Sequence, residues 1–199
     1  MKYVIMSDGK MNRWKEKHNI PKHLMKIKGE TLLQRIVRQV KNNDKDAEII
    51  ITSHNKKYDI DGAIRYEPLD NKIEIDRFTY ELIDDNCCFL YGDTYYTDSC
   101  IKKIMNTVTN ELIFYGNNVS IIALVVKDKL LMKRCIDQVK KDYLNGKLEE
   151  CTGWQLYYQY LKIKRIKDSN ENYFVKVNDG TQGFNTYEEY ENFIREELS

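Results

Sequence analysis

MKYVIMSDGKMNRWKEKHNIPKHLMKIKGETLLQRIVRQV, residues 1–40, is the stretch that decides the fold. A short apolar run at 3–6 has the length of a buried strand, a polar loop follows it, and the apolar spacing becomes helical from about Glu30. A second apolar run at 48–52 again has the length of a buried strand. Strand, helix and strand in this order predict a βαβ unit, in which the two strands are parallel and the crossover is right-handed.

The loop after the first strand suits a phosphate group. Gly9 permits close approach of the backbone, the loop offers a run of amide N–H groups, and Lys10 and Arg13 add positive charge. Ligands in open α/β sheets bind beyond the carboxyl ends of the strands, where this loop lies. We therefore expect anion binding at residues 7–13. His54 follows the second strand at the same edge, but a lone histidine there is more typical of a solvated loop.

A second signal is the apolar run at 87–91, which ends in Gly92 and Asp93. This order places a carboxylate at the carboxyl edge of the sheet, where a glycine allows the backbone to approach a ligand. Magnesium prefers one or two hard carboxylate oxygens together with substrate phosphates, and Asp93 meets that requirement. The alternative is an aspartate that opens a turn. We interpret Asp98 as the cap of a helix at 100–107.

The remaining pattern predicts, in chain order, a short strand at 63–66, a helix at 72–84, adjacent strands at 111–116 and 120–126, and helices at 128–144 and 153–163. The last helix is dense in aromatic residues, which form either core or an acceptor pocket: Trp154, Tyr157, Tyr158 and Tyr160. Residues 173–190 predict a strand, a turn and a helix opened by Asn185 or Thr186.

Composition favours one globular domain. The chain has 199 residues, of which 42% are hydrophobic, so it is long enough for one domain with a substantial core. The formal net charge of +1 gives no bulk basic field that would indicate a nucleic-acid partner. No window approaches the roughly 18 apolar residues of a membrane span, and we expect a cytoplasmic protein. Five cysteines without C-x-x-C spacing argue against disulfides and against a zinc site.

Three separated motifs together resemble the nucleotidyltransferases that couple NTPs to sugar phosphates or phospho-alcohols. In that family the first loop reads A-A-G-x-G-x-R, and Pro-Lys and then I-x-G-x-x-L-L follow it. The matching positions here are 7–13, Pro21-Lys22 and 27–33, with Asp8 in place of a small residue and Met11 in place of the second glycine. The other two motifs are the strand that ends in Gly92-Asp93 and the segment around Asn185, where the family has its second metal ligand.

The resemblance implies a three-layer α/β/α sandwich with a mixed, mostly parallel sheet, close to the nucleotide-diphospho-sugar transferase fold and Rossmann-like in its N-terminal half. It implies a single domain at 1–199, with a nucleotide-binding half at 1–107 and an acceptor-binding half at 108–199. The implied activity is Mg²⁺-dependent transfer of a nucleotide from an NTP to a phosphorylated small acceptor, with release of pyrophosphate. CTP is slightly favoured over UTP, and precursors of cell-surface polysaccharides are the expected products.

The same resemblance implies a set of site residues. Lys22, Arg13 and Asp93 would be catalytic, and Asp93 and Asn185 would hold the metal, with Asp179 as a fallback ligand. The residues implied to bind nucleotide are Ser7, Asp8, Gly9, Lys10, Glu67, Asn71 and Gly92, with Arg77 as a further candidate. For Glu67, Asn71 and Arg77 the alternative is a solvated charged surface.

Two alternatives to this enzyme stay open. A glycosyltransferase of the same fold would carry Asp-x-Asp after the strand, whereas residues 93–95 read Asp-Thr-Tyr. A non-catalytic relative that binds nucleotide is the second, because Asp8, Met11 and Asn185 depart from the family pattern. The base, the acceptor and the oligomeric state are also open at this point.

Overall fold

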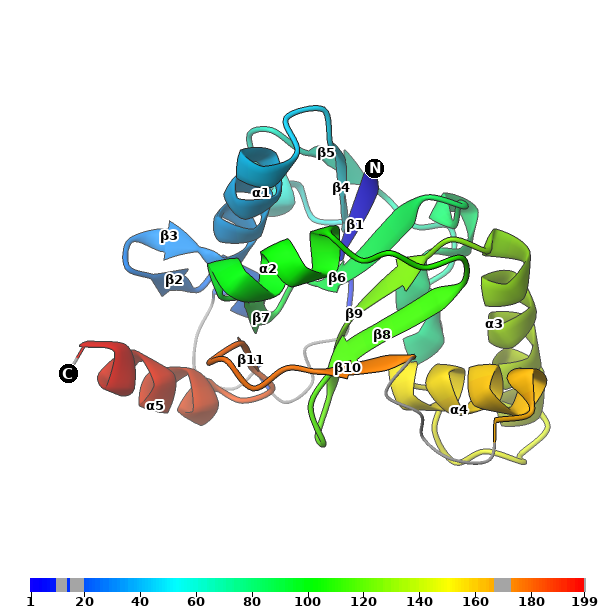
Figure 1. Cartoon of the computed structure of the whole chain (residues 1–199). Coiled ribbons are helices and arrows are strands. Elements are labelled where there is room, and N and C mark those ends of the chain that lie inside the picture. The colour runs from blue at the N-terminus through cyan, green and yellow to red at the C-terminus, as the bar shows by residue number, and fades with distance from the viewer. Residues whose placement is uncertain (10–13, 15–19, 167–172, 199) are drawn as a thin grey trace.

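A seven-stranded mixed sheet forms the middle layer of the chain, seen here in a computed structural model that describes residues 1–9, 14, 20–166 and 173–198 (Figure 1). The strand order is β10-β8-β9-β6-β1-β4-β5. Strand β1 pairs in parallel with both β4 and β6, and β9 then joins β6 antiparallel. The predicted three-layer fold with a mixed, mostly parallel sheet is confirmed.

The strands of this sheet are β1 (Lys2–Met6), β4 (Glu48–Thr52), β5 (Ile64–Tyr66), β6 (Cys87–Tyr91), β8 (Leu112–Gly116), β9 (Ile121–Val126) and β10 (Phe174–Lys176). Two small antiparallel pairs lie outside it: β2 (Lys26–Ile27) with β3 (Glu30–Thr31), and β7 (Thr94–Tyr95) with β11 (Gln182–Gly183). The α-helices are α1 (Leu32–Asn43), α2 (Asp98–Met105), α3 (Lys129–Leu144), α4 (Gly153–Lys164) and α5 (Tyr187–Leu198). The 3₁₀ turns are η1 (Lys22–Leu24), η2 (Lys56–Tyr58), η3 (Glu74–Phe78) and η4 (Tyr80–Leu82).

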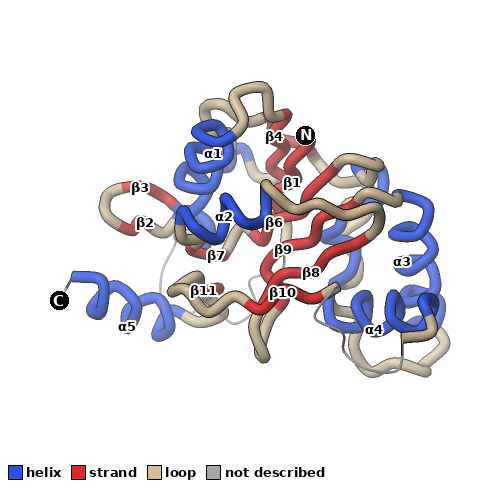
Figure 2. Tube along the Cα trace, in the orientation of Figure 1, coloured by secondary structure: helices blue, strands red, loops and turns tan. Residues whose placement is uncertain are grey.

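The two faces of the sheet build two separate cores. Because side chains alternate along a strand, Tyr3 and Ile5 of β1 pack with α1 and α2, whereas Val4 and Met6 pack with α3, α4 and η3. Figure 2 shows the same division, with α1 and α2 on one side of the red strands and α3 and α4 on the other. The helices therefore cover both faces and leave the carboxyl edge of the parallel strands for loops.

Local signals in the sequence explain where most helices begin. Thr31 opens α1 with a capping box to Gln34, and Thr152 opens α4 in the same way with Gln155. Asp128 caps α3 by accepting a hydrogen bond from the amide of Leu131. The predicted helices at 128–144 and 153–163 are confirmed to within a residue.

The helix predicted at 72–84 is wrong. The structure has two 3₁₀ turns there, η3 and η4, because Thr79 lies between them in the left-handed region with φ of 37° and interrupts any helix. The carboxylate of Asp76 accepts hydrogen bonds from the amides of Lys72 and Ile73 at 2.8 and 2.9 Å. Hydrogen bonds to the buried side chain of Asp76 therefore hold this segment, where an α-helix would use backbone hydrogen bonds.

The cap predicted for α2 also needs correction. The hydroxyl of Thr97, not the carboxylate of Asp98, accepts the hydrogen bond from the amide of Cys100. Asp98 is the first residue of the helix, and its carboxylate accepts a bond of 2.6 Å from the side chain of Gln39 on α1. The helix consequently starts two residues earlier than predicted.

The C-terminal helix α5 packs on the β2–β3 hairpin and not on the main sheet. The apolar cluster between them joins Ile27, Leu32, Tyr95, Phe184 and Phe193. The hairpin itself turns through Lys28 and Gly29, both with positive φ, which matches the two-residue turn preferred between antiparallel strands. This third cluster ties the end of the chain to its beginning.

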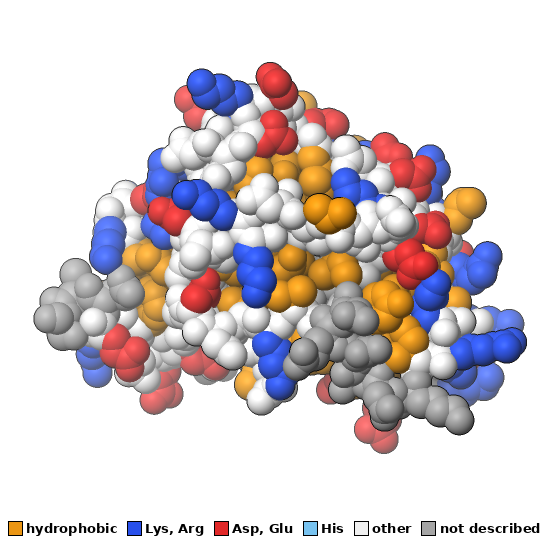
Figure 3. Space-filling view, viewed as in Figure 1, with side chains coloured by type: hydrophobic (Ala, Val, Ile, Leu, Met, Phe, Trp, Pro, Cys, Tyr) orange, Lys and Arg blue, Asp and Glu red, His pale blue; other side chains and the backbone are white. Residues whose placement is uncertain are grey.

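The surface carries no field of a single sign on the face shown in Figure 3, where acidic and basic side chains are interspersed. Among the described residues, none of the helices has the length and apolar character needed to cross a bilayer.

Candidate active site

The centre of the site is an ion pair between Asp93 and Lys22. Asp93 follows β6 at the carboxyl edge of the sheet, and Lys22 opens η1 directly after Pro21. The ammonium group contacts Oδ2 of the carboxylate, and each side chain is only 16% exposed. Burial is the largest single influence and raises the pKa of Asp93, but the neighbouring positive groups, Lys22 first among them, together outweigh it, and the pKa lies below its usual value. The carboxylate is therefore ionised at neutral pH.

Gly92 is required by the neighbouring strand. A Cβ at this position would lie 2.9 Å from the carbonyl oxygen of Met6 and would press against the hydroxyl of Ser7. The amide of Gly92 donates a hydrogen bond of 3.0 Å to that same carbonyl. The close approach at Gly92 is thus to the end of β1 and to Ser7.

His23, the residue after Lys22 in η1, is buried. Its ring is 2% exposed, and Nδ1 lies 3.0 Å from the hydroxyl of Tyr58. Burial lowers the pKa of His23 to about 3, so the ring is neutral at pH 7. Its Cδ2 would lie 3.2 Å from a Cβ at position 92, which packs η1 against the end of β6. No periodic pattern in the sequence identifies this histidine.

Asn185 lines the same pocket as Asp93, and backbone pairing between β11 and β7 positions the segment that carries it. We call residues 177–186 the C-terminal strap. Within it β11 pairs with β7, and the amide of Phe184 donates a hydrogen bond of 3.0 Å to the carbonyl of Asp93. Thr186, not Asn185, caps the start of α5, since its hydroxyl accepts from the amide of Glu189 at 3.2 Å. The side chain of Asn185 is not used as that cap, and it lines the pocket together with Asp93.

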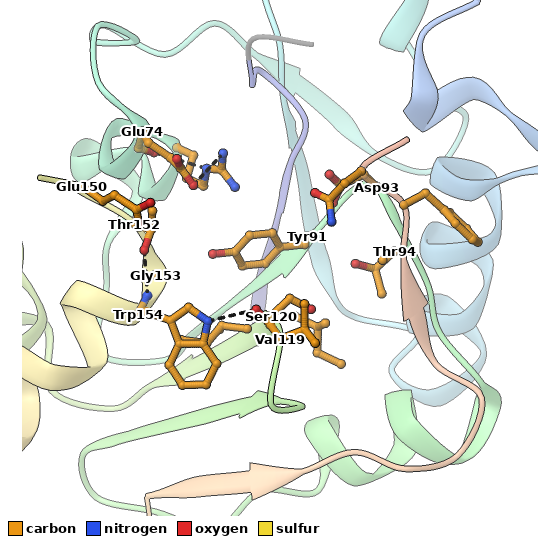
Figure 4. A pocket seen from close by; sticks show the side chains of 16 residues that line it. Glu74, Tyr91, Asp93, Thr94, Val119, Ser120, Glu150, Thr152, Gly153 and Trp154 are labelled. Carbon is orange, nitrogen blue, oxygen red and sulfur yellow. Dashed lines mark hydrogen bonds and ion pairs between the residues drawn. The ribbon is translucent and has the colours of Figure 1, made fainter. Parts of the chain in front are cut away.

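The pocket has a volume of about 320 Å³ and two different ends (Figure 4). Asp93 and Thr94 lie at one end, with Tyr91 in the middle. The other end is formed by Glu74, Glu150, Thr152 and Trp154, which come from η3 and from the start of α4. Segments far apart in the sequence therefore meet on one cavity at the carboxyl edge of β6.

Arg77 is a cation on this pocket that belongs to η3. Its guanidinium lies 3.3 Å from the carboxylate of Glu74 and 5.4 Å from the ring centre of Tyr91. Burial lowers its pKa, but Tyr91, Glu74 and Asp93 raise it further, so the net pKa is raised. Its Nη2 would lie 3.9 Å from a Cβ at Gly9, so Arg77 also borders the first loop.

The first loop is described as far as Gly9 and at residue 14, so the predictions for Lys10 and Arg13 lie outside the described residues. Ser7 is 3% exposed, and its hydroxyl has no hydrogen-bond partner in the described part of the chain. Asp8 does not point its carboxylate into the pocket. It binds His54 and Asn71 on the neighbouring loops.

Glu67 and Asp179 lie away from the pocket. Glu67 is an exposed residue whose carboxylate pairs with Arg65 at 2.7 Å. The carboxylate of Asp179 accepts hydrogen bonds from the hydroxyls of Thr97 and Ser99 at 2.6 and 2.8 Å. The fallback ligand is therefore tied to the start of α2, whereas Asn185 stays beside Asp93.

The aromatic residues of α4 divide between core and pocket. Tyr157 and Tyr160 are buried, and Tyr158 is 57% exposed. Trp154 lines the pocket, stacks on Phe174 at 5.4 Å, and donates a hydrogen bond from its indole N–H to the carbonyl of Val119. The Thr-x-x-Gln pattern at Thr152 and Gln155 is a capping box, which is a sequence signal for the start of a helix.

The donor set fits magnesium in part. A carboxylate and a side-chain amide, Asp93 and Asn185, face one cavity, and Mg²⁺ commonly completes such a set with water and substrate phosphate oxygens. Within the residues that the structure describes, no group of three or more His, Cys, Asp or Glu side chains could hold a metal ion by itself. Lys22 contacts one oxygen of Asp93, and a carboxylate has a second oxygen for a cation.

The comparisons with known proteins identify the fold. Neither a protein-family model nor a curated protein matches the sequence. Among solved structures, the CTP:phosphocholine cytidylyltransferase of Streptococcus pneumoniae is 15% identical with a TM-score of 0.59, and the match covers 100% of this chain and 99% of that one.

Two further structures match at similar levels. A putative glucose-1-phosphate thymidylyltransferase from Bacillus anthracis is 12% identical with a TM-score of 0.65, and the match covers 98% of this chain and 94% of that one. The 4-diphosphocytidyl-2C-methyl-D-erythritol synthase of Anaerococcus prevotii is 12% identical with a TM-score of 0.63, with coverage of 100% and 96%. The chain therefore has the nucleotidyltransferase fold, with its candidate site at the sheet edge where Asp93, Lys22 and Asn185 meet.

Proposed function

We propose that the chain is a Mg²⁺-dependent nucleotidyltransferase that joins an NTP to a phosphorylated small molecule and releases pyrophosphate. The observation that carries this proposal is that Asp93 and Asn185 line one cavity, and that Lys22 is paired with Asp93. The fold, shared over the full chain with nucleotidyltransferases, supports the same reaction. In this proposal residues 1–107 bind the nucleotide and 108–199 bind the acceptor within one domain.

The chemical problem is repulsion between two anions. An acceptor phosphate oxygen attacks the α-phosphorus of the NTP, a new P–O bond forms, and the bond to the leaving pyrophosphate breaks. Two unit charges about 4 Å apart repel by about 4 kcal/mol at an effective dielectric of about 20, which amounts to roughly three orders of magnitude in rate. The acceptor oxygen is already ionised near neutral pH, so no general base is required.

The residues of the site match this problem. The ammonium group of Lys22 contacts Oδ2 of Asp93, which lines the pocket, and it can leave that oxygen for a phosphate. Arg77 adds a second cation on the pocket wall. Lys10, Arg13 and the backbone amides around Gly9 are assigned to the triphosphate on the resemblance alone. Asp93 and Asn185 would hold Mg²⁺, and the bound ion supplies neutralisation of phosphate charge.

The far end of the pocket favours a phospho-alcohol with a cationic head over a neutral sugar phosphate. Glu150 has no hydrogen bond or ion pair with any described side chain and faces the cavity beside Trp154. A carboxylate next to an aromatic ring is the usual environment for an organic cation. The cytidylyltransferase of S. pneumoniae is named for phosphocholine, and CTP remains the nucleotide we favour slightly over UTP. Precursors of cell-surface polysaccharides, made in the cytoplasm, fit such a product.

A pyrophosphate-release assay tests this proposal. CTP, UTP, GTP, dTTP and ATP are each combined with phosphocholine, phosphoethanolamine or glucose 1-phosphate, in Mg²⁺ or in EDTA. We expect release that requires both substrates and Mg²⁺, is greatest for one NTP, and falls at least 100-fold in Lys22→Ala.

Lys26→Ala is the matched control, because Lys26 is an exposed lysine on the β2–β3 hairpin and loses the same charge. Release without dependence on an acceptor would indicate a hydrolase. No release with any pair would favour the non-catalytic relative.

A further inference from the structure

The carboxylate of Asp8 joins three loops that are far apart in the sequence. Oδ1 accepts a hydrogen bond from the backbone amide of His54 at 3.0 Å, and Oδ2 lies 2.7 Å from Nδ1 of the same residue. The side-chain amide of Asn71 donates to Oδ2 at 2.8 Å and to the backbone carbonyl of Asp8 at 2.7 Å. We call Asp8, His54 and Asn71 the Asp8 clip.

The clip joins the loops that follow the carboxyl ends of three neighbouring strands. Asp8 follows β1, His54 follows β4, and Asn71 lies in the loop after β5, and these three strands are adjacent in the sheet. The strands are in register at this edge, where Met6 pairs with Thr52 and Thr52 pairs with Tyr66. The clip therefore sits where ligands of open parallel sheets bind.

Both oxygens of the Asp8 carboxylate accept hydrogen bonds from other residues of the chain. Its side chain is 13% exposed, and both oxygens already accept hydrogen bonds from neighbouring loops. An anion beside a triphosphate would otherwise repel it. Because both of its oxygens are held by the neighbouring loops, Asp8 acts on the position of the chain at the start of the loop and not on the phosphates directly.

The clip also reaches the pocket through a short segment. Only two residues separate Asn71 from η3, which places Glu74 and Arg77 on the pocket wall. Arg77 in turn borders Gly9, the residue after Asp8, where a Cβ would lie 3.9 Å from its Nη2. The loop after β1 is thus connected to the wall of the pocket in two ways. Asp8 binds Asn71, which leads into η3, and Gly9 lies beside Arg77 of η3.

We propose that Asp8 is a positioning residue that pre-forms the start of the nucleotide-binding loop, residues 7–9, by clamping it to the loops after β4 and β5. This inference rests on the proposed function. A loop already held in its binding conformation loses less conformational entropy when the NTP binds. Loss of the clip should therefore weaken the ground state and the transition state alike, which appears in KM for the NTP more than in kcat.

Steady-state kinetics of Asp8→Ala test the proposal. We expect KM for the NTP to rise 10- to 30-fold, kcat to fall less than threefold, and KM for the acceptor to stay within twofold. Asn71→Ala should give the same split, and the double variant should be no worse than the single ones, because both remove one clip. Asp8→Asn keeps an acceptor oxygen for the amide of His54, so its KM should lie between wild type and Asp8→Ala.

Asp70→Ala is the matched control, since Asp70 is an exposed carboxylate beside Asn71 that lies 3.5 Å from Lys72 and takes no part in the clip. Hydrogen exchange without nucleotide gives a readout that needs no activity: the amide of His54 should be protected in wild type and exchange faster in Asp8→Ala. An active wild type with an unchanged KM for the NTP in Asp8→Ala overturns this inference alone. A wild type that neither binds nor turns over any NTP overturns the proposed function as well.

Discussion

The two sides of the site are held together by different means. On the side proposed for the nucleotide, the loops after β1, β4 and β5 are joined by side chains, with Asp8 at the centre. On the side proposed for the acceptor, the C-terminal strap is joined to β7 by backbone hydrogen bonds, and Asn185 comes directly after that ladder. A side-chain clip depends on the identity of single residues, whereas a backbone ladder tolerates many side chains. Substitutions on the first side should therefore cost more than those on the second.

The largest effect is expected where the two sides meet. Asp93→Ala removes the carboxylate that pairs with Lys22 and should lower turnover by at least 1000-fold. It should also lower the free energy of unfolding by about 3–5 kcal/mol, because the ammonium group of Lys22 is left largely buried without a partner.

Kinetics and chemical denaturation of Asp93→Ala, Lys22→Ala and the double variant separate the two losses. The double variant should regain part of the stability and none of the turnover. Full recovery of turnover in the double variant would show that the pair is only structural.

Gly92→Ala should be a costly glycine substitution. The added Cβ would meet the carbonyl oxygen of Met6 at 2.9 Å, so the ends of β1 and β6 must separate. We expect a loss of about 3 kcal/mol in the free energy of unfolding. Gly183→Ala on the strap is the control, because its Cβ would lie 3.5 Å from the hydroxyl of Thr94, an ordinary contact. Equal losses in the two variants would contradict the packing described for Gly92.

Asp76 should give the nucleotide side a characteristic acid dependence. Burial raises the pKa of this carboxyl, but the amides of Ile73 and Lys72 and the charge of Lys140 lower it further, so the folded-state pKa is below the unfolded value. A depressed pKa contributes stability that is complete above the unfolded pKa, near 4, and is lost as the pH falls through the folded pKa.

Asp76→Asn should lower the free energy of unfolding by about 2 kcal/mol at pH 7, because a charged hydrogen-bond acceptor is lost. The difference from wild type should shrink below about pH 4. Thermal unfolding midpoints of both proteins between pH 3 and pH 7 provide the measurement. A difference that stays constant over this range would mean that the pKa of Asp76 is the same in the folded and unfolded states.

Asp179→Ala should have the smallest effect. It removes the acceptor for the hydroxyls of Thr97 and Ser99, while the β7–β11 ladder and the bond from Phe184 to Asp93 remain. We expect a loss of about 1 kcal/mol in stability and less than a fivefold loss of turnover. A loss of turnover as large as that in Asp93→Ala would restore Asp179 as a metal ligand and remove that role from Asn185.

The same contrast explains what the sequence could predict. Apolar runs and helix-stop signals are local, so the sequence predicts β1, β4, α3 and α4, and the end of β6 predicts Asp93 at the sheet edge. Asn185 could be assigned to the site only from the family resemblance. The segment at 72–84 was misread because its helical spacing is overridden by Asp76, whose partners include Lys140 on α3. The Asp8 clip and His23 depend on contacts between distant residues, and no periodicity in the chain reports those.

The most direct test of the central claim follows the label from an NTP through a single turnover. With [α-³²P]CTP, or the NTP that proves best, and a phosphorylated acceptor, the account predicts that the α-phosphate appears in the acceptor product. With [γ-³²P]CTP the label should appear only in pyrophosphate. Transfer of the γ-label to the acceptor, or release of the α-label as free nucleotide without any product, would contradict displacement at the α-phosphorus and with it the role given to Lys22, Asp93 and Asn185.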